Sequence, residues 1–264
     1  MKNHNFILIP IFSLFILISC NKSSDITEPN SRTYEDIQED FNNITFETGN
    51  NDISIENLNG NTWGFRVVMP DVDFTNNDRP LIISLHGCTT CGVFPDAHKN
   101  TDCLESLGFS SLNAIILSPN SHGESWTTLN NYEQIFSLID LASTYLPIDT
   151  NKIVIHGYSD GGNASWFFGE TESNIFSAAV PIATQYNTIS NGIGRQMPIP
   201  FYVIHGENDT FFPLSNVQNW VNTSVNAGSD ITLVVAPGLT HTEPCEYISH
   251  LQNASDWLLN DVWN

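Results

Sequence analysis

The chain has 264 residues, of which 41% are hydrophobic, which suits one α/β domain of moderate size better than two domains. Only 8 Lys and Arg oppose 29 Asp and Glu, so the formal net charge is −21. This charge argues against a nucleic-acid-binding protein, which needs a basic face, and against electrostatic binding to anionic lipid head groups. A neutral substrate would meet less repulsion at such a surface than an anionic one.

The N-terminus carries the features of an export signal. Lys2 precedes an uncharged apolar run over residues 6–19, which is too short to cross a bilayer as a helix of roughly 20 residues. The run ends in "LISC", which resembles the lipobox of bacterial lipoproteins. The resemblance implies a signal peptide over residues 1–19 and a lipid such as palmitate on Cys20. The exported protein would then be anchored to a bacterial membrane, at the outer membrane, the cell surface or a periplasmic face. An ordinary signal peptide with an incidental cysteine is the alternative.

Residues 20–45 are polar, acidic and poor in large apolar side chains. Such a composition buries little surface, so we expect a tether here and a folded domain over residues 46–264.

Short apolar runs alternate with amphipathic ones in the rest of the chain, and no sequence repeat is visible. Predicted strands cover residues 63–70, 80–87, 113–119, 152–157, 176–182, 200–206 and 231–237, and predicted helices cover 130–146, 214–228 and 243–263. Unbroken apolar strands are typical of a sheet that is buried on both faces. The alternation predicts a mostly parallel sheet with helices on both sides.

A serine on a tight corner is the first candidate for chemistry. Ser159 lies between Gly157 and Gly161 in "KIVIHGYSDGGNASW", after an apolar strand and before a helical stretch. This is the context of the G-x-S-x-G nucleophile elbow, in which small neighbours permit a strained turn that exposes the serine. The alternative is an ordinary turn serine.

A serine hydroxyl needs a base, and the base needs an orienting acid. His241 lies in "PGLTH" after the last strand, and Asp209 lies in "HGENDTFFP" after the preceding one. The order Ser159, Asp209, His241 is that of α/β-hydrolases. Glu207 is the competing acid, but the spacing to Pro213 favours Asp209.

Other histidines and acids admit different interpretations. His86, His156 and His205 each precede a glycine at a strand end and are interpreted as structural. A zinc site of His241, Glu243 and Cys245 is possible by residue type, but it leaves the other motifs unexplained. We therefore expect no metal and no cofactor.

Four motifs in the right order, from about Trp63 to the end, resemble the esterase group of α/β-hydrolases. These are "LHGCTT", "HGYSDGG", "HGENDTFFP" and "GLTH", and the group includes phospholipase/carboxylesterase-like, dienelactone-hydrolase-like and polyhydroxybutyrate-depolymerase-like enzymes. The resemblance implies an ester hydrolase that forms an acyl-enzyme. It also implies an oxyanion hole made of the backbone N–H groups of Cys88 and Asp160, with Thr89 as the fallback donor. Phe212 stands where valine is usual in the acid loop.

Only "ATQYNTISNGIGRQM" separates two predicted strands where many hydrolases of this fold insert a cap. We therefore expect no large cap domain, an open cleft and a monomer. Trp126, Tyr186, Phe211 and Phe212 are candidates for the pocket wall, although Trp126 and Phe212 could equally pack against the sheet. An open cleft suits ester groups on polysaccharides or polyester fragments. The alternatives are a serine peptidase of the same fold and a non-catalytic surface-binding lipoprotein.

Four cysteines remain besides Cys20, and an even number in an exported chain suggests two disulfides. The oxyanion loop and the base loop must both lie beside Ser159, so we predict that Cys88 pairs with Cys245 and Cys91 with Cys103. The alternatives are the other two pairings, four free thiols, and a redox or zinc role for the C-x-x-C.

Overall fold

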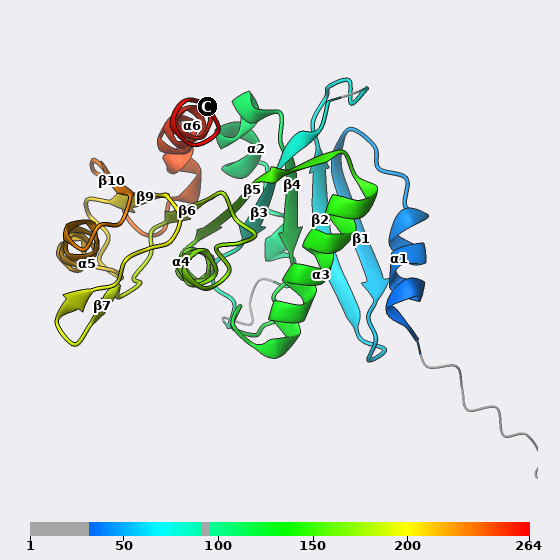
Figure 1. Ribbon diagram of the computed structural model, residues 1–264, viewed down its shortest axis with the longest axis horizontal. Coiled ribbons are helices and arrows are strands. Elements are labelled where there is room, and N and C mark those ends of the chain that lie inside the picture. The colour runs from blue at the N-terminus through cyan, green and yellow to red at the C-terminus, as the bar shows by residue number, and fades with distance from the viewer. Residues whose placement is uncertain (1–31, 76, 91–94) are drawn as a thin grey trace, which may run out of the picture. The chain divides into compact units, whose positions relative to one another are not determined.

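The computed structural model describes residues 32–75, 77–90 and 95–264 (Figure 1). The predicted signal peptide, the predicted lipidation site Cys20, the first part of the predicted tether and Cys91 lie outside the described residues. Within the described ranges, no helix is both long enough and apolar enough to span a membrane.

One large sheet organises the domain. Its strands are β1 (Gly49–Glu56), β2 (Thr62–Met69), β3 (Arg79–Leu85), β4 (Ile115–Pro119), β5 (Ile148–Tyr158), β6 (Ala178–Ile182), β9 (Phe201–Gly206) and β10 (Ile231–Ala236). They lie in the order β1-β2-β4-β3-β5-β6-β9-β10. β2 is antiparallel to both β1 and β4, and the strands from β4 to β10 are parallel. The predicted, mostly parallel sheet is therefore confirmed.

Helices cover both faces of this sheet. They are α1 (Tyr34–Asn42), α2 (Glu105–Gly108), α3 (Leu129–Tyr145), α4 (Asp160–Thr171), α5 (Leu214–Asn226) and α6 (Ile248–Trp257), with short 3₁₀ turns at Ala97–Lys99, Ser110–Leu112 and Pro244–Tyr247 and a π turn at Leu258–Val262. On β3, Leu81 and Ile83 join the core under α1, α3, α4 and α5, whereas Ile82 joins the core under α6 (Figure 1). Successive strand residues point to opposite faces, which is why β3 is apolar throughout.

The predicted tether is wrong at its C-terminal end. Residues Tyr34–Asn42 form α1, which begins with a capping box at Thr33 and buries Ile37 and Phe41 completely. These two apolar residues are four positions apart and therefore lie on one face of the helix. Two anchors suffice for packing even in an otherwise acidic segment, so the folded domain starts near residue 32 and not at residue 46.

The segment between β6 and β9 carries only a small hairpin, made of β7 (Ile189–Ser190) and β8 (Ile193–Gly194). The expectation of a domain without a large cap is thus confirmed for the described residues.

The predicted disulfide pairing is also wrong. Cys245 pairs with Cys103, with a distance of 5.2 Å between the two Cα atoms. The reason is the packing of α2 against α6, which is so close that a Cβ on Gly108 would lie 2.5 Å from the Leu251 side chain. Cys103 precedes α2 and Cys245 precedes α6, so this contact brings the two cysteines together. Cys88 is disulfide-bonded as well.

Candidate active site

Ser159 occupies the corner between β5 and α4 in a strained backbone conformation, with φ 55° and ψ −116°. The two flanking glycines make this corner possible. A Cβ on Gly157 would lie 2.2 Å from the Gly161 carbonyl oxygen, and a Cβ on Gly161 would lie 1.8 Å from the Leu85 carbonyl oxygen. No larger residue fits at either position, which is the steric reason for the G-x-S-x-G pattern.

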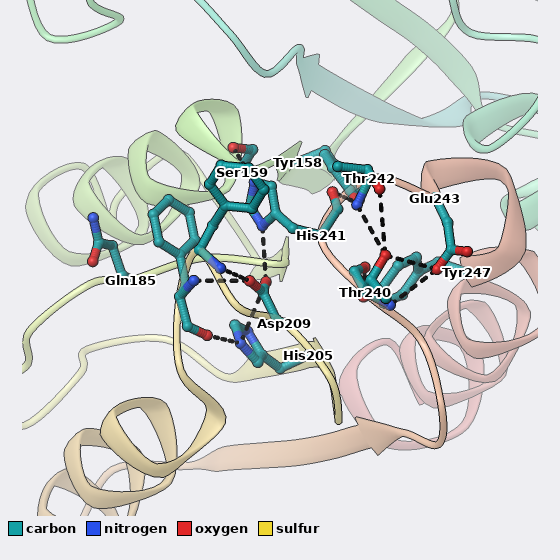
Figure 2. Close-up of polar contacts among 12 residues, drawn as sticks. Tyr158, Ser159, Gln185, His205, Asp209, Thr240, His241, Thr242, Glu243 and Tyr247 are labelled. Carbon is teal, nitrogen blue, oxygen red and sulfur yellow. Dashed lines mark hydrogen bonds and ion pairs between the residues drawn. The ribbon is translucent and has the colours of Figure 1, made fainter.

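The structure brings Ser159, His241 and Asp209 into one hydrogen-bonded row (Figure 2). Ser159 Oγ lies 2.8 Å from His241 Nε2, and His241 Nδ1 lies 2.8 Å from Asp209 Oδ2. The carboxylate is an acceptor only, so Nδ1 carries the proton and Nε2 is left to accept from the serine hydroxyl. The Asp209 side chain is fully buried, and the His241 side chain is 12% exposed.

The acid loop holds Asp209 in place from its other side. Asp209 Oδ1 accepts hydrogen bonds from the backbone N–H groups of Phe211 and Phe212, at 2.9 and 2.8 Å. His205 Nε2 donates to the Phe212 carbonyl oxygen at 2.7 Å, and burial lowers the pKa of this histidine. His205 therefore supports the loop as a neutral ring. Glu207, the competing acid, is exposed and accepts from the Gly238 N–H instead.

Two tyrosines fix the loop that carries the base. The Tyr158 hydroxyl donates to the His241 carbonyl oxygen at 2.7 Å, and the Tyr247 hydroxyl donates to the Thr240 carbonyl oxygen at 2.8 Å (Figure 2). Burial raises the pKa of both hydroxyls, so they remain donors. These contacts set the backbone from which the His241 ring projects.

The structure gives no support to a zinc site on this loop. The Glu243 carboxylate accepts from both the N–H and the hydroxyl of Thr240, and Cys245 is held in its disulfide with Cys103. No cluster suited to a metal ion occurs among the residues that the structure describes.

The segment after β3 approaches the serine corner closely. A Cβ on Gly87 would lie 3.1 Å from the Ser159 Cβ, and Cys88 follows with a positive φ of 57°. The Thr89 N–H donates to Asp160 Oδ2 at 3.1 Å, so the fallback donor is already engaged. Asp160 is the first residue of α4, where a backbone N–H has no partner within the helix. Sequence reasoning missed the Asp160 carboxylate as the link between the two segments, because the contact spans distant parts of the chain.

The other two histidines interpreted as structural, His86 and His156, also bond to backbone groups of the sheet and its loops. His86 Nε2 accepts from the Ser121 N–H at 3.2 Å, and His156 Nδ1 lies 2.7 Å from the Val180 carbonyl oxygen. Neither ring lies in the row of Ser159, His241 and Asp209.

A cavity of about 270 Å³ adjoins the serine corner. Its lining includes Thr89, Trp126, Asp160, Phe167 and Tyr186. Trp126 is 2% exposed and donates its indole N–H to the His86 carbonyl oxygen, so it both packs in the core and closes the cavity wall.

The other aromatic candidates lie elsewhere or are held by specific contacts. The Tyr186 hydroxyl donates to Glu170 at 2.6 Å, and Arg195 binds the same carboxylate. Phe212 is not part of the cavity wall and instead lies edge-on to the His241 ring, with centroids 4.7 Å apart. Phe211 is 65% exposed beside the same ring.

Comparison with known proteins places the chain in a family. The sequence pattern of the family described as phospholipase/carboxylesterase matches residues 113–258. Feruloyl esterase D of Neurospora crassa is 26% identical over 162 residues, which cover 58% of this chain and 55% of that protein. The chain thus spans about half the length of this curated relative.

Solved structures show the same fold. Fluorophosphonate-binding serine hydrolase F of Staphylococcus aureus has a TM-score of 0.64 at 15% identity, covering 81% of this chain and all of that one. Esterase 2 of Thermogutta terrifontis has a TM-score of 0.63 at 15% identity, covering 82% and 96%. The chain therefore belongs to the phospholipase/carboxylesterase family and has the α/β-hydrolase fold.

Proposed function

We propose that the protein is a serine carboxylesterase, with Ser159 as nucleophile, His241 as base and Asp209 as acid. The observation that carries this proposal is the row of two 2.8 Å hydrogen bonds from Ser159 through His241 to Asp209. Ser159 Oγ attacks the ester carbonyl carbon while its proton passes to His241 Nε2. Asp209 stabilises the imidazolium that forms.

The negative oxygen of the tetrahedral intermediate needs donors on the far side of the reacting carbon. The backbone N–H groups of Cys88 and Asp160 are our candidates. The positive φ of Cys88 turns its peptide away from the direction of β3, and Asp160 adds the positive end of the α4 dipole. The hydrogen bond between Thr89 and Asp160 holds the segment after β3 against the start of α4.

The intermediate collapses as His241 returns the proton to the leaving alcohol, and an acyl group remains on Ser159. Water then attacks the acyl-enzyme and gives its proton to His241. The bond to Ser159 Oγ breaks, His241 returns the proton to Oγ, and the acid is released. We infer that the substrates are esters of carbohydrates or of other extracellular material. The absence of a large cap in the described residues supports this, as does the similarity to a feruloyl esterase.

The Ser159→Ala variant tests the catalytic assignment. The variant should fold, because it loses only one oxygen at a half-buried corner. Hydrolysis of p-nitrophenyl acetate should fall by at least about a thousandfold. A variant that keeps more than about a tenth of the wild-type rate would remove Ser159 from the role of nucleophile.

A peptide p-nitroanilide, assayed beside the ester, separates an esterase from a serine peptidase of the same fold. We expect turnover of the ester and none of the anilide. A wild-type preference for the anilide would assign the site to a peptidase.

We further propose that Cys20 anchors the mature, exported protein to a membrane through lipid, since the apolar run stops at this cysteine. Metabolic labelling with a fatty acid should mark the wild type and leave a Cys20→Ser variant unlabelled. Label retained in the variant would place the anchor elsewhere.

A further inference from the structure

Three cavities line up along one edge of the sheet and share residues at their borders. The cavity beside the serine corner is bounded by Thr89, which also borders a second cavity of about 290 Å³. That second cavity is bounded by His122, which also borders a third cavity of about 410 Å³. Neighbouring cavities thus adjoin at Thr89 and at His122, and we call this series of adjoining cavities, from the serine corner to the third cavity, the track.

The third cavity, which we call the amide pocket, is built by a turn and a helix that the topology places at the catalytic edge. β1 and β4 are both antiparallel to β2, so β1 runs in the same direction as the parallel strands. The turn 57–61 that follows β1 therefore lies at the same edge as the loops after β3, β4 and β5 (Figure 1). The loop after β4 and the first residues of α3 complete the wall.

The lining of the amide pocket is polar and carries no cationic side chain. Its residues are Asn57, Asn61, Thr62, Trp63, His122, Glu124, Asn130, Asn131 and Gln134. Five of these side chains end in a carboxamide, which offers two N–H donors and one carbonyl acceptor. Such a wall suits neighbouring hydroxyl groups, each of which both donates and accepts. The absence of Lys and Arg from this lining, and the acidic chain around it, disfavour an anionic ligand.

Internal hydrogen bonds hold the buried part of this wall in one arrangement. Asn131 is 2% exposed and donates to the Ser121 carbonyl oxygen at 3.1 Å, and Gln134 is 1% exposed and donates to the Gly64 carbonyl oxygen at 3.1 Å. Since each NH₂ group already donates to a backbone carbonyl, the amide carbonyl oxygen is left as an acceptor. A wall fixed before binding loses little side-chain entropy when a ligand arrives.

The exposed part of the wall is also ordered. Asn57 Oδ1 accepts from the N–H groups of Asn59 and Asn61, which shapes the turn. Asn130 donates to Glu124 at 3.3 Å, and the Thr128 hydroxyl donates to the same carboxylate. Asn61 and Asn130 thus stand at the mouth on segments that are already structured.

We propose that the amide pocket is a subsite for a neutral oligosaccharide, which holds the glycan part of an ester while the acyl group reaches Ser159. This inference rests on the proposed esterase function, because the track joins the two sites. The hydroxyl groups of neutral sugar rings match the carboxamides of the wall, and the track gives a chain of sugar residues a path past His122 and Thr89.

Binding is measured on the Ser159→Ala protein, so that no hydrolysis is needed. Titration calorimetry with xylohexaose, cellohexaose and mannohexaose should detect binding of at least one of them. Adding Asn61→Ala and Asn130→Ala together should weaken that affinity about tenfold, since two hydrogen-bonding side chains are lost. The matched control is Asn219→Ala, an exposed asparagine on α5, which should leave the affinity unchanged.

Kinetics on the Ser159 protein give the second readout. We expect the Asn61→Ala and Asn130→Ala pair to lower kcat/KM for an acetylated oligosaccharide relative to kcat/KM for p-nitrophenyl acetate. If none of the three sugars binds, or if the control weakens binding as much as the pair does, the subsite is refuted while the esterase assignment stands. If Ser159→Ala still hydrolyses p-nitrophenyl acetate, the proposed function itself fails, whatever the sugars do.

Discussion

At the scale of single residues, Ser159 depends on its neighbours to hold a conformation that costs of order 1–3 kcal/mol. Its N–H donates to the Ile182 carbonyl oxygen at 3.0 Å, and its own carbonyl accepts from Asn163 at 2.9 Å. Gly157 and Gly161 remove the side chains that would otherwise clash. The strain is therefore held by β6 and α4 together and is not a local property of the turn.

The acid can be assigned by a pair of matched substitutions. Asp209→Asn should lower kcat for p-nitrophenyl acetate on the order of 10³–10⁴-fold, because an amide cannot both orient His241 and stabilise its cation. Glu207→Gln should stay within a few-fold of wild type, because this side chain is exposed and contacts Gly238. Steady-state kinetics decide the matter, and the reverse ranking would move the acid to Glu207.

At the scale of elements, a disulfide ties the loop that carries His241 to the pair of helices α2 and α6. The Cys103–Cys245 disulfide joins the start of α2 to the segment only four residues beyond His241. Sequence reasoning reached this loop but chose the wrong partner, because it considered only which loops meet at Ser159. The sequence does not reveal that α2 and α6 pack closely, at a distance that only the missing side chain of Gly108 permits.

Replacing both Cys103 and Cys245 by serine should lower the free energy of unfolding by about 2–4 kcal/mol, because the bridge restrains a long loop of the unfolded chain. Urea denaturation measures the change. Peptide mapping of the non-reduced wild type should find a peptide pair linked through Cys103 and Cys245. A pair linked through Cys88 and Cys245 would contradict the structure.

α1 is the element whose role departs furthest from expectation, and its packing can be tested directly. The Phe41 ring lies 5.7 Å from the ring of Phe46 and 6.2 Å from that of Phe65. Phe41→Ala should therefore cost about 3–5 kcal/mol of stability. Glu39→Ala, on the exposed side of the same helix, should change stability by less than about 0.5 kcal/mol. Equal, small effects would show that α1 is a tether after all.

The central strands and the motifs could be located along the chain from the sequence, because both depend on short-range patterns. Apolar runs predicted β3 and β5, and four motifs predicted which loops meet at Ser159. β1 was missed because it is an edge strand with an alternating, largely polar face. The Asp160 contact and the amide pocket could not be predicted, since both arise from segments that only the fold brings together.

At the scale of the whole molecule, one buried histidine makes the stability of the fold sensitive to acid. His98 is 4% exposed, and burial lowers its pKa from 6.5 to about 4. Between these values the unfolded chain binds a proton that the folded chain does not. The stability that depends on neutral His98 is therefore complete above pH 6.5 and is lost as the pH falls towards 4.

A His98→Gln variant should lose this part of the pH dependence. In the wild type one proton contributes a slope of at most about 1.4 kcal/mol per pH unit between pH 6.5 and 4. Urea unfolding at several pH values should give the variant a shallower curve across this window. Parallel curves for the two proteins would show that His98 does not differ in protonation between the folded and unfolded states.

The disulfide between Cys103 and Cys245 also has a topological consequence for the active site. Ser159, Asp209 and His241 all lie between Cys103 and Cys245, so the three residues belong to one covalent ring. A protease that cuts the exposed tip of the β7–β8 hairpin, beside Gly192, would open the ring without dividing the molecule. The nicked protein should migrate as a single chain until it is reduced, and only then separate into one fragment with the nucleophile and another with the acid and base.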